Sequence, residues 1–378
     1  MKVAIVHDWL YGGGAEKVVE SLHQMYPDAP IYTSYCTDEW RIKLDGKVIT
    51  SYMNLWPFSK MRKFLPLLRQ WWFSGLDLTE YDVVISSCGN GEARFISVRE
   101  SAIHIAYTHT PTHFYWRKYD EYIRNPGMRP QWLARLGLKT LVGRLRNNDY
   151  YASQRVDYFI ANSNHIKNDI ERYYGRDSEV VHPPVDTARF LKKRHSKANL
   201  SPRFVMWGRL VPYKRFDLAV KACNELELNL DIVGDGPELA NLRLLAGPTV
   251  NLLGRASDEE LERVAQSADA FLFPGEEDFG ISPVEAMSAG LPVIAFRSGG
   301  ALDYVVPGKT GVYFEEQTVE SMVKGIKRFN PSNFDSHKIA LYAITNFDDK
   351  IFKQKMKSIV EREFENMRAR RREELQSN

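Results

Sequence analysis

Residues 270–296 read AFLFPGEEDFGISPVEAMSAGLPVIAF, and their pattern indicates the fold class. It holds two short apolar runs, Ala270–Phe273 and Val293–Phe296, on either side of a segment expected to be helical from about Pro283. Each run is apolar at consecutive positions, which is typical of a strand buried on both faces of a parallel sheet. A strand, a helix and a second strand in this order predict a βαβ unit.

Similar runs recur along the chain in two series, separated by segments of helical periodicity. The first series is Val3–Val6, Tyr81–Ser86, Ile103–Tyr107, Val156–Ala161 and Val180–Val181, and the second is Phe204–Trp207, Leu230–Val233, Val250–Leu253, Ala270–Phe273 and Val293–Phe296. Two series predict two Rossmann-like α/β domains, each with a doubly wound parallel sheet.

The domain boundary is predicted in Asp186–Pro202, a basic segment without apolar periodicity. We therefore expect an N-terminal domain at 1–186, a linker at 187–202 and a C-terminal domain at 203–348. Residues 349–378 predict a long polar helix with one apolar stripe, expected to return toward the N-terminal domain.

The composition is that of an ordinary globular protein: 378 residues, 44% of them hydrophobic, with 51 Lys and Arg against 48 Asp and Glu. The net charge of +3 conceals an uneven distribution, because residues 101–195 carry 16 basic and 9 acidic side chains, or +7. Three scattered cysteines predict neither a disulfide framework nor a zinc site. The N-terminal apolar run is too short for a signal peptide, so a cytoplasmic protein is expected.

Two turns that follow predicted strands carry residues able to bind phosphate, one rich in glycine and one basic. The glycine-rich turn, Gly12-Gly13-Gly14-Ala15-Glu16, comes after the first strand and opens a helix, where backbone N–H groups can approach a phosphate. A tight turn without a ligand explains the same residues.

The second turn, WGRLVPYKR at 207–215, places Arg209 and Lys214 at the carboxyl edge of the second sheet, and these cations suit a diphosphate. The alternative is a solvated basic turn.

The most specific pattern is the pair Glu277 and Glu285, which flanks a glycine-containing loop at a strand end. Ser282 to Glu285 also fits S-x-x-E, so Glu285 has an alternative role in a capping box. That alternative leaves the acidic run Glu276-Glu277-Asp278 unexplained. Acidic side chains on one loop repel each other unless they are solvated or have partners, and sugar hydroxyls are such partners.

With these motifs the chain resembles the retaining glycosyltransferases of family 4. The stretches that carry the resemblance are HDWLYGGGAE, ANSNHIKNDI, VVHPPVDTARF, WGRLVPYKRFDLAV, DIVGDGPEL, LLGRASDEEL and FLFPGEEDFGISPVEAMSAGLPVIAFRSGGALDYV, and YTHTPTHFYWRKYDEY is similar to bacterial polysaccharide mannosyltransferase-like members. The resemblance implies the GT-B architecture: two facing Rossmann-like domains, a cleft between them and a C-terminal helix.

The resemblance also implies roles for individual residues. Residues implied to act in catalysis are His109, Glu277, Arg209 and Lys214; donor binding is implied for Gly13, Gly14, Arg209, Lys214, Glu277, Phe279, Gly280, Ile281 and Glu285. Arg209 and Lys214 match the diphosphate-binding pair, and Glu285 matches the glutamate held on the ribose. No D-x-D triplet occurs, so we expect a reaction without metal or other cofactor. A metal cluster of His104, His109 and His113 is disfavoured, because Pro111 interrupts any helix that would join the last two.

The resemblance implies transfer of a hexose, preferably mannose from GDP-mannose, to a polysaccharide or lipid-linked saccharide. A UDP-sugar donor, a nucleotide-sugar epimerase and a non-catalytic nucleotide-sugar-binding subunit are the alternatives. Residues 57–73, PFSKMRKFLPLLRQWWF, are basic, aromatic and free of acidic side chains. They predict either peripheral contact with an anionic membrane at its cytoplasmic face or a helix packed within the first domain. Nucleic-acid binding has no supporting motif.

Overall fold

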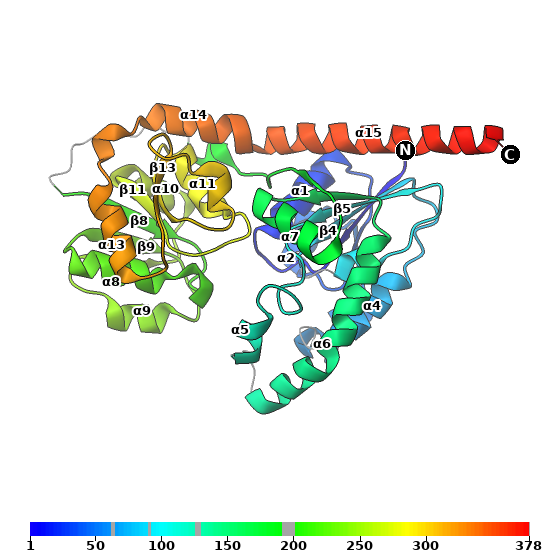
Figure 1. Cartoon of the computed structure of the whole chain (residues 1–378), viewed down its shortest axis with the longest axis horizontal. Helices are drawn as coiled ribbons and strands as arrows, with labels where there is room; N and C mark the ends of the chain where they lie inside the picture. Colours follow the sequence, from blue (N-terminus) through cyan, green and yellow to red (C-terminus); the bar gives the residue numbers. More distant parts are fainter. Residues whose placement is uncertain (62–64, 90–91, 125–129, 191–200, 378) are drawn as a thin grey trace. The chain divides into compact units, whose positions relative to one another are not determined.

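The computed structural model describes residues 1–61, 65–89, 92–124, 130–190 and 201–377 (Figure 1). The chain forms two compact units, each with its own parallel sheet. The first unit comprises Met1–Pro183 together with Phe352–Asn378, and the second comprises Pro184–Ile351.

The first unit contains a seven-stranded sheet in the order β3-β2-β1-β4-β5-β6-β7, and every pair of neighbours is parallel. Its strands are β1 (Val3–His7), β2 (Ile31–Thr33), β3 (Val48–Thr50), β4 (Val83–Cys88), β5 (Ile103–Thr108), β6 (Tyr158–Ala161) and β7 (Glu179–Val180). Strands β1, β4 and β5 are buried throughout, which explains why their side chains are apolar or small apart from His7 and His104. The chain order reverses between β1 and β4, so the switch point of the sheet lies there.

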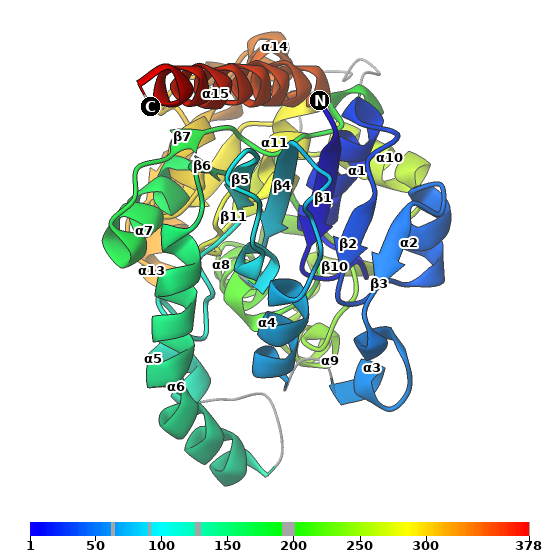
Figure 2. The ribbon, with the colours of Figure 1, turned by 90° about the vertical axis from the view of Figure 1, so that its right-hand side faces the viewer.

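Helices connect these parallel strands. They are α1 (Ala15–Met25), α2 (Asp38–Lys43), α3 (Phe58–Met61), α4 (Pro66–Ser74), α5 (Tyr119–Arg124), α6 (Gln131–Gln154) and α7 (Asn164–Tyr174), with 3-10 helices η1 (Tyr52–Asn54) and η3 (Glu92–Phe95). Figure 2 shows α1 and α2 beside the strands of the sheet and α6 extending away from them.

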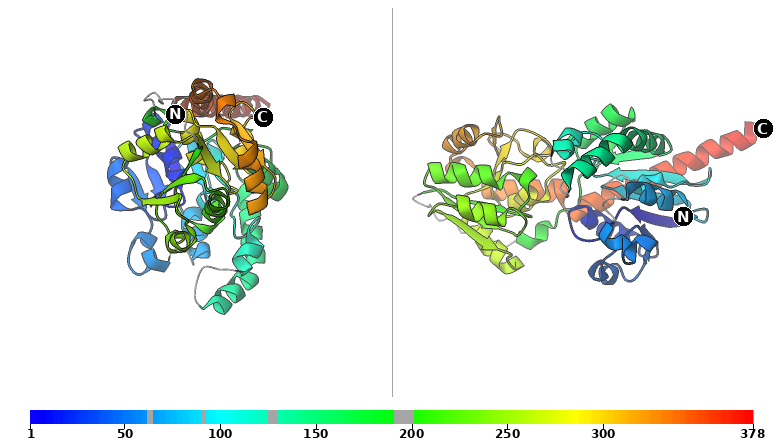
Figure 3. Two further views of the ribbon diagram at one scale, coloured as in Figure 1. Left: turned by 90° about the vertical axis from the view of Figure 1, so that its left-hand side faces the viewer. Right: turned by 90° about the horizontal axis from the view of Figure 1, so that it is seen from below.

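The long C-terminal helix α15 (Asp349–Ser377) packs on the first unit. Phe352, Met356, Ile359 and Val360 are buried in one core with residues of β1, β4, β5 and α1. Beyond these residues its side chains are mostly exposed, and its C-terminal end extends past the rest of the unit (Figure 3). The predicted apolar stripe is therefore the face that α15 buries.

The second unit contains a six-stranded sheet in the order β10-β9-β8-β11-β12-β13. Its strands, all parallel to their neighbours, are β8 (Arg203–Trp207), β9 (Asn229–Val233), β10 (Val250–Gly254), β11 (Ala270–Phe273), β12 (Val293–Phe296) and β13 (Gly311–Phe314). The helices are α8 (Phe216–Glu225), α9 (Leu239–Leu245), α10 (Asp258–Ser267), α11 (Ile281–Ser288), α12 (Ala301–Tyr304), α13 (Val319–Arg328) and α14 (Ser336–Phe347), with 3-10 helices η4 (Thr187–Phe190), η5 (Pro212–Lys214) and η6 (Pro331–Asn333).

The structure differs from the sequence expectation at the domain boundary. Thr187–Phe190 forms η4 inside the second unit, whereas a linker was expected from residue 187. Phe190 is buried and stacks on Trp207 at a centroid distance of 5.7 Å, and Val185 N–H bonds to Phe347 O. These contacts hold the segment in place. Residues 191–200 of the expected linker lie outside the described part of the chain.

Candidate functional site

The carboxyl ends of β8 and β11 form the switch point of the second sheet. These strands are neighbours, and the chain order reverses between them: β9 and β10 lie on one side, β12 and β13 on the other. Open α/β sheets bind ligands in the crevice at such a point. The turn after β8 begins at Gly208, and the loop after β11 begins at Pro274, so both predicted motifs of this unit meet here.

Lys214 and Glu277 form an ion pair between these two turns. Lys214 Nζ donates to Glu277 Oε1 over 2.6 Å, and the two side chains are 14% and 16% exposed. Burial opposes the charge on Lys214, but the Glu277 carboxylate outweighs it and raises the lysine pKa above its ordinary value. Lys214 therefore stays cationic across the physiological pH range.

Gly208 begins the turn after β8 and lies next to two polar side chains. Gly208 has φ +142°, and a Cβ built there would lie 3.5 Å from Lys214 Nζ and 3.7 Å from Ser282 Oγ. The Gly208 backbone, Lys214 and Ser282 thus border the same space. The sequence pattern suggests only a capping role for Ser282, yet the structure places its hydroxyl group beside the basic turn.

Arg209 lies in the same turn with its side chain exposed. Its Nη2 is 3.4 Å from the Tyr213 hydroxyl oxygen, which accepts a long hydrogen bond. The exposed guanidinium and the more buried Lys214 ammonium therefore extend from one short segment, as the sequence predicted.

Glu285 is held by a residue that sequence reasoning did not assign. The Trp207 indole Nε1–H donates to Glu285 Oε2 over 3.2 Å, and both side chains are buried. The capping-box alternative is wrong, because α11 begins after Gly280 and has no side-chain cap. A capping box does occur in this unit, at Ser257 and Glu260. Glu285 lies in the second turn of α11 and is fixed by β8.

The acidic loop has partners within the protein. Glu276 accepts a 2.8 Å hydrogen bond from Ser298 Oγ, and Glu277 O accepts one of 2.8 Å from Gly300 N–H. A Cβ on Gly299 would lie 2.3 Å from Glu277 O, so only glycine permits this approach. The Ser298–Gly300 segment after β12 therefore supports the loop, and sugar hydroxyls are not needed to explain its stability.

The predicted backbone positions follow this loop. Phe279 is buried, Gly280 has φ +87°, and Ile281 starts α11. A Cβ on Gly280 would lie 2.8 Å from both Phe273 Cζ and the Tyr304 hydroxyl oxygen. The geometry thus requires glycine at 280 and brings the first N–H groups of α11 to the same edge of the sheet.

The remaining predicted residues belong to the first unit. The Glu16 carboxylate accepts a 3.0 Å hydrogen bond from Gly12 N–H, and a Cβ on Gly13 would lie 2.9 Å from Glu16 Oε2. Gly14 is the N-cap residue of α1, and because it is a glycine its position supplies no side-chain capping hydrogen bond. The glycine loop is therefore closed around a carboxylate of its own helix.

His109 follows β5 and is largely buried. Its Nε2 lies 2.8 Å from Ser87 Oγ, whereas His104 Nε2 lies 2.8 Å from Ser86 Oγ. The two imidazoles therefore have separate hydroxyl partners. Among the residues with described positions, no group of three or more His, Cys, Asp and Glu side chains is arranged to hold a metal ion.

Two family models match consecutive parts of the chain. Residues 12–189 match Glycosyltransferase Family 4, and residues 188–346 match Glycosyl transferases group 1. Among curated relatives, the GDP-mannose-dependent alpha-(1-6)-phosphatidylinositol monomannoside mannosyltransferase of Mycobacterium tuberculosis is 33% identical over 174 residues, covering 39% of this chain and 45% of that protein. The sulfoquinovosyl transferase SQD2 of Arabidopsis thaliana is 32% identical over 160 residues, covering 40% of this chain and 31% of that protein. These matches span less than half of each relative.

Solved structures are similar over nearly the whole chain. Anabaena HepE in complex with UDP has a TM-score of 0.67 at 17% identity, covering 96% of this chain and all of that one. Sucrose-phosphate synthase from Thermosynechococcus elongatus has a TM-score of 0.68 at 15% identity, covering 97% and 100%. At these identities the likeness supports the fold alone, and it shows the GT-B fold of two parallel-sheet Rossmann-like domains. The two family models, which together span residues 12–346, show that the chain belongs to the family 4 type of glycosyltransferases.

Proposed function

We propose that this chain is a retaining glycosyltransferase that moves a hexose from a nucleotide-sugar to a polysaccharide or lipid-linked saccharide. The observation that carries the proposal is the Lys214–Glu277 pair at the switch point of the second sheet, with Arg209 in the same turn. A partly buried carboxylate and two cations at one edge of the sheet suit a ligand that has a sugar next to a diphosphate.

Breaking the anomeric bond develops negative charge on the leaving diphosphate and positive charge on the sugar ring. Lys214 and Arg209 stabilise the diphosphate, and Lys214 needs little reorganisation because Glu277 already holds it. The N-terminus of α11 adds backbone N–H groups that favour an anion. Because the turn supplies two cations, we propose that the reaction proceeds without a metal ion.

Glu277 stabilises the transferred sugar in this proposal and is not a nucleophile. Its carboxylate is already engaged by the Lys214 ammonium, which lowers its nucleophilicity. The leaving phosphate accepts the proton of the attacking acceptor hydroxyl on the same face of the sugar, so the anomeric configuration is retained. Glu285, held by the Trp207 indole, receives the ribose hydroxyls of the nucleotide.

GDP-mannose is the preferred donor because the names of several matching relatives specify it. A UDP-sugar is the alternative, supported by a structural neighbour that contains UDP-glucose. Measuring the melting temperature with GDP-mannose, GDP, UDP-glucose and UDP distinguishes them, because a ligand of the folded state raises it. GDP-mannose and GDP are expected to raise it. If only UDP-glucose and UDP raise the melting temperature, the donor is a UDP-sugar. If none of the four ligands raises it, donor binding is contradicted.

A further inference from the structure

Helix α6 leaves a stripe of large apolar side chains in solvent. Trp132, Leu133 and Leu136 are 65%, 51% and 53% exposed, and their spacing places them on one helical face. We call these three residues the α6 stripe. In Figures 1 and 2 this N-terminal part of α6 extends beyond the rest of the first unit. A contiguous patch of exposed apolar side chains is typical of a site that binds another protein or a membrane, whereas scattered single apolar side chains are common on any protein surface.

The charges of α6 determine which partner fits the stripe. The helix contains four basic residues and a single acidic residue, Asp149, which is completely buried. Arg135 donates to the carbonyl oxygens of Ile123 and Arg124, and Arg146 donates to that of Tyr115. Lys139 and Arg144 are exposed and lie on the same side of the helix as the stripe. The outer face of α6 is therefore apolar and cationic.

Helices α3 and α4 provide a second exposed apolar cluster in this unit. Trp71 is 69% exposed, Phe58 38% and Met61 48%, and the Tyr52 ring contacts both Phe58 and Trp71. The segment 57–73 is not one continuous amphipathic helix, because α3 and α4 are separate. Residues 62–64 lie outside the described positions. Arg69 of α4 is buried, so this predicted membrane-facing cation points into the protein.

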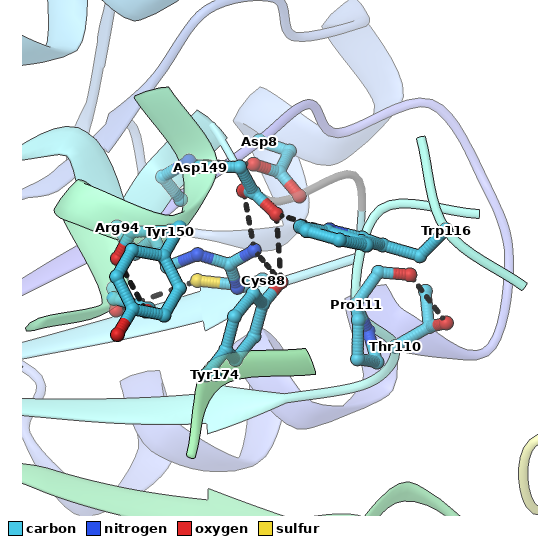
Figure 4. A network of polar contacts seen from close by, with 12 residues as sticks. Asp8, Cys88, Arg94, Thr110, Pro111, Trp116, Asp149, Tyr150 and Tyr174 are labelled. Carbon is cyan, nitrogen blue, oxygen red and sulfur yellow. Dashed lines mark hydrogen bonds and ion pairs between the residues drawn. The ribbon is translucent and has the colours of Figure 1, made fainter. Parts of the chain in front are cut away.

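Two buried ion pairs tie α4 and α6 to the same 3-10 helix, η3. Arg69 of α4 donates to Glu92 over 2.7 Å, and Arg94 donates to Asp149 of α6 over 2.6 Å. Figure 4 shows Arg94 and Asp149 together with Trp116 and Tyr174, which both donate to Asp149.

The two helices also contact each other directly. Asn148 of α6 donates to the Gln70 side chain of α4 over 3.0 Å. Together with the ion pairs to η3, this contact makes the surface formed by α4 and α6 a fixed part of the fold, and its exposed aromatic side chains need no rearrangement before they meet a partner.

We infer that the first unit docks on an anionic lipid surface through the α6 stripe, with Lys139 and Arg144 at the headgroups. An interfacial helix inserts Trp and Leu side chains, and its cations pair with anionic lipid. A second copy of the chain is a poorer occupant, because it would bring the same cations against each other. The inference goes beyond the proposed function and does not depend on it, since that proposal rests on the switch point of the second sheet.

Sedimentation with lipid vesicles tests the docking. The wild-type chain is expected to sediment at low salt with vesicles of equimolar phosphatidylcholine and phosphatidylglycerol, and much less with phosphatidylcholine alone. The Trp132→Gln, Leu133→Gln, Leu136→Gln triple variant is expected to partition at least about tenfold less. The double variant Lys139→Glu, Arg144→Glu is expected to partition onto the anionic vesicles about tenfold less or lower still, because each basic side chain near the membrane surface contributes to binding.

Leu244→Gln with Leu341→Gln is the matched control, because these side chains are 86% and 60% exposed but belong to the second unit. The control is expected to sediment like the wild type. The inference would be overturned if the control lost as much vesicle sedimentation as the stripe variant, if the stripe variant lost none, or if the wild type did not sediment. It would also be overturned if the wild type formed a dimer in size-exclusion chromatography and the stripe variant alone did not. Thermal shifts with GDP or UDP test donor binding separately in every variant.

Discussion

Lys214 Nζ and Glu277 Oε1, 63 residues apart in the sequence, are joined by a 2.6 Å hydrogen bond. The bond links the turn after β8 to the loop after β11, at the point where the chain order of the second sheet reverses. Parallel strands make this contact possible, because the carboxyl ends of β8 and β11 lie at the same edge. The pair therefore exists in the fold before any ligand binds, which is the condition for electrostatic preorganisation.

Replacing Glu277 separates binding from transfer. Glu277→Ala is expected to lower the rate of transfer by about 100-fold or more, because the sugar loses a preorganised charged contact. Affinity for the nucleoside diphosphate is expected to persist, since Lys214 and Arg209 remain. Titration calorimetry with the diphosphate and a transfer assay measure the two effects. Glu276→Ala is the control on the same loop, because Glu276 bonds to Ser298 instead of Lys214; an equal loss of transfer there would contradict a specific role for Glu277.

Trp207→Phe removes the indole N–H from Glu285 but keeps an aromatic ring against Phe271 and Phe190. The donor KM is expected to rise about tenfold, because one hydrogen bond of about 1.5 kcal/mol no longer orients the carboxylate. The kcat value is expected to change less. Trp116→Phe makes the same change in the first unit, where the indole donates to Asp149. An unchanged KM in Trp207→Phe, or an equal rise in both variants, would exclude positioning of Glu285 by Trp207.

The Arg94–Asp149 pair contributes to stability rather than to chemistry. Both side chains are completely buried. Burial opposes the charge on Arg94, but the Asp149 carboxylate outweighs it and raises the pKa of Arg94 above its ordinary value. Asp149→Ala is therefore expected to cost about 3 kcal/mol or more, since the buried guanidinium loses its counter-charge. Glu315→Ala breaks the exposed pair with Arg297 and is expected to cost less than about 1 kcal/mol. Urea unfolding compares them, and similar costs would show that burial is not the deciding factor.

His104 makes the folded state sensitive to acid. Burial, assisted by Arg155 and Arg94, lowers the pKa of His104 from 6.5 to about 3. Between these values the unfolded chain binds a proton that the folded chain does not, so the free energy of unfolding falls as the pH falls below about 6.5. The loss at pH 5 is expected to be about 2 kcal/mol. His104→Gln cannot titrate, so its unfolding free energy should depend less steeply on pH; an equal slope would assign the acid sensitivity to other groups.

Much of the fold was predictable because strands buried on both faces are mostly apolar at consecutive positions. The runs at β1, β5, β8 and β11 were placed to within a residue or two. The missed strands are β2, β3 and β13, and they are only three or four residues long. In the edge strand β3, Ile49 is 45% exposed, so no buried run marks it. Short or edge strands are defined by their pairing partners, which a single segment does not contain.

The positions of the candidate-site turns were predictable because glycine and charge follow a strand there, whereas their distant side-chain partners were not. The sequence placed Arg209, Lys214 and Glu277 in turns at strand ends, where the structure also has them. Trp207 and Ser298 were not assigned, because their partners Glu285 and Glu276 are 78 and 22 residues away. The pattern S-x-x-E at Ser282 also shows the limit of local reading, since the same pattern forms a capping box at Ser257–Glu260 but not at Ser282–Glu285.

The rate at which the donor releases its nucleoside diphosphate, measured with acceptor present in the wild type and in Lys214→Ala, tests the donor site directly. Lys214→Ala is expected to lower this rate about 10²–10³-fold with an unchanged circular dichroism spectrum. Lys338→Ala, which removes an 83% exposed lysine from α14, is predicted to retain the wild-type rate. A wild-type rate in Lys214→Ala would contradict the assignment of the donor site to the Lys214–Glu277 pair.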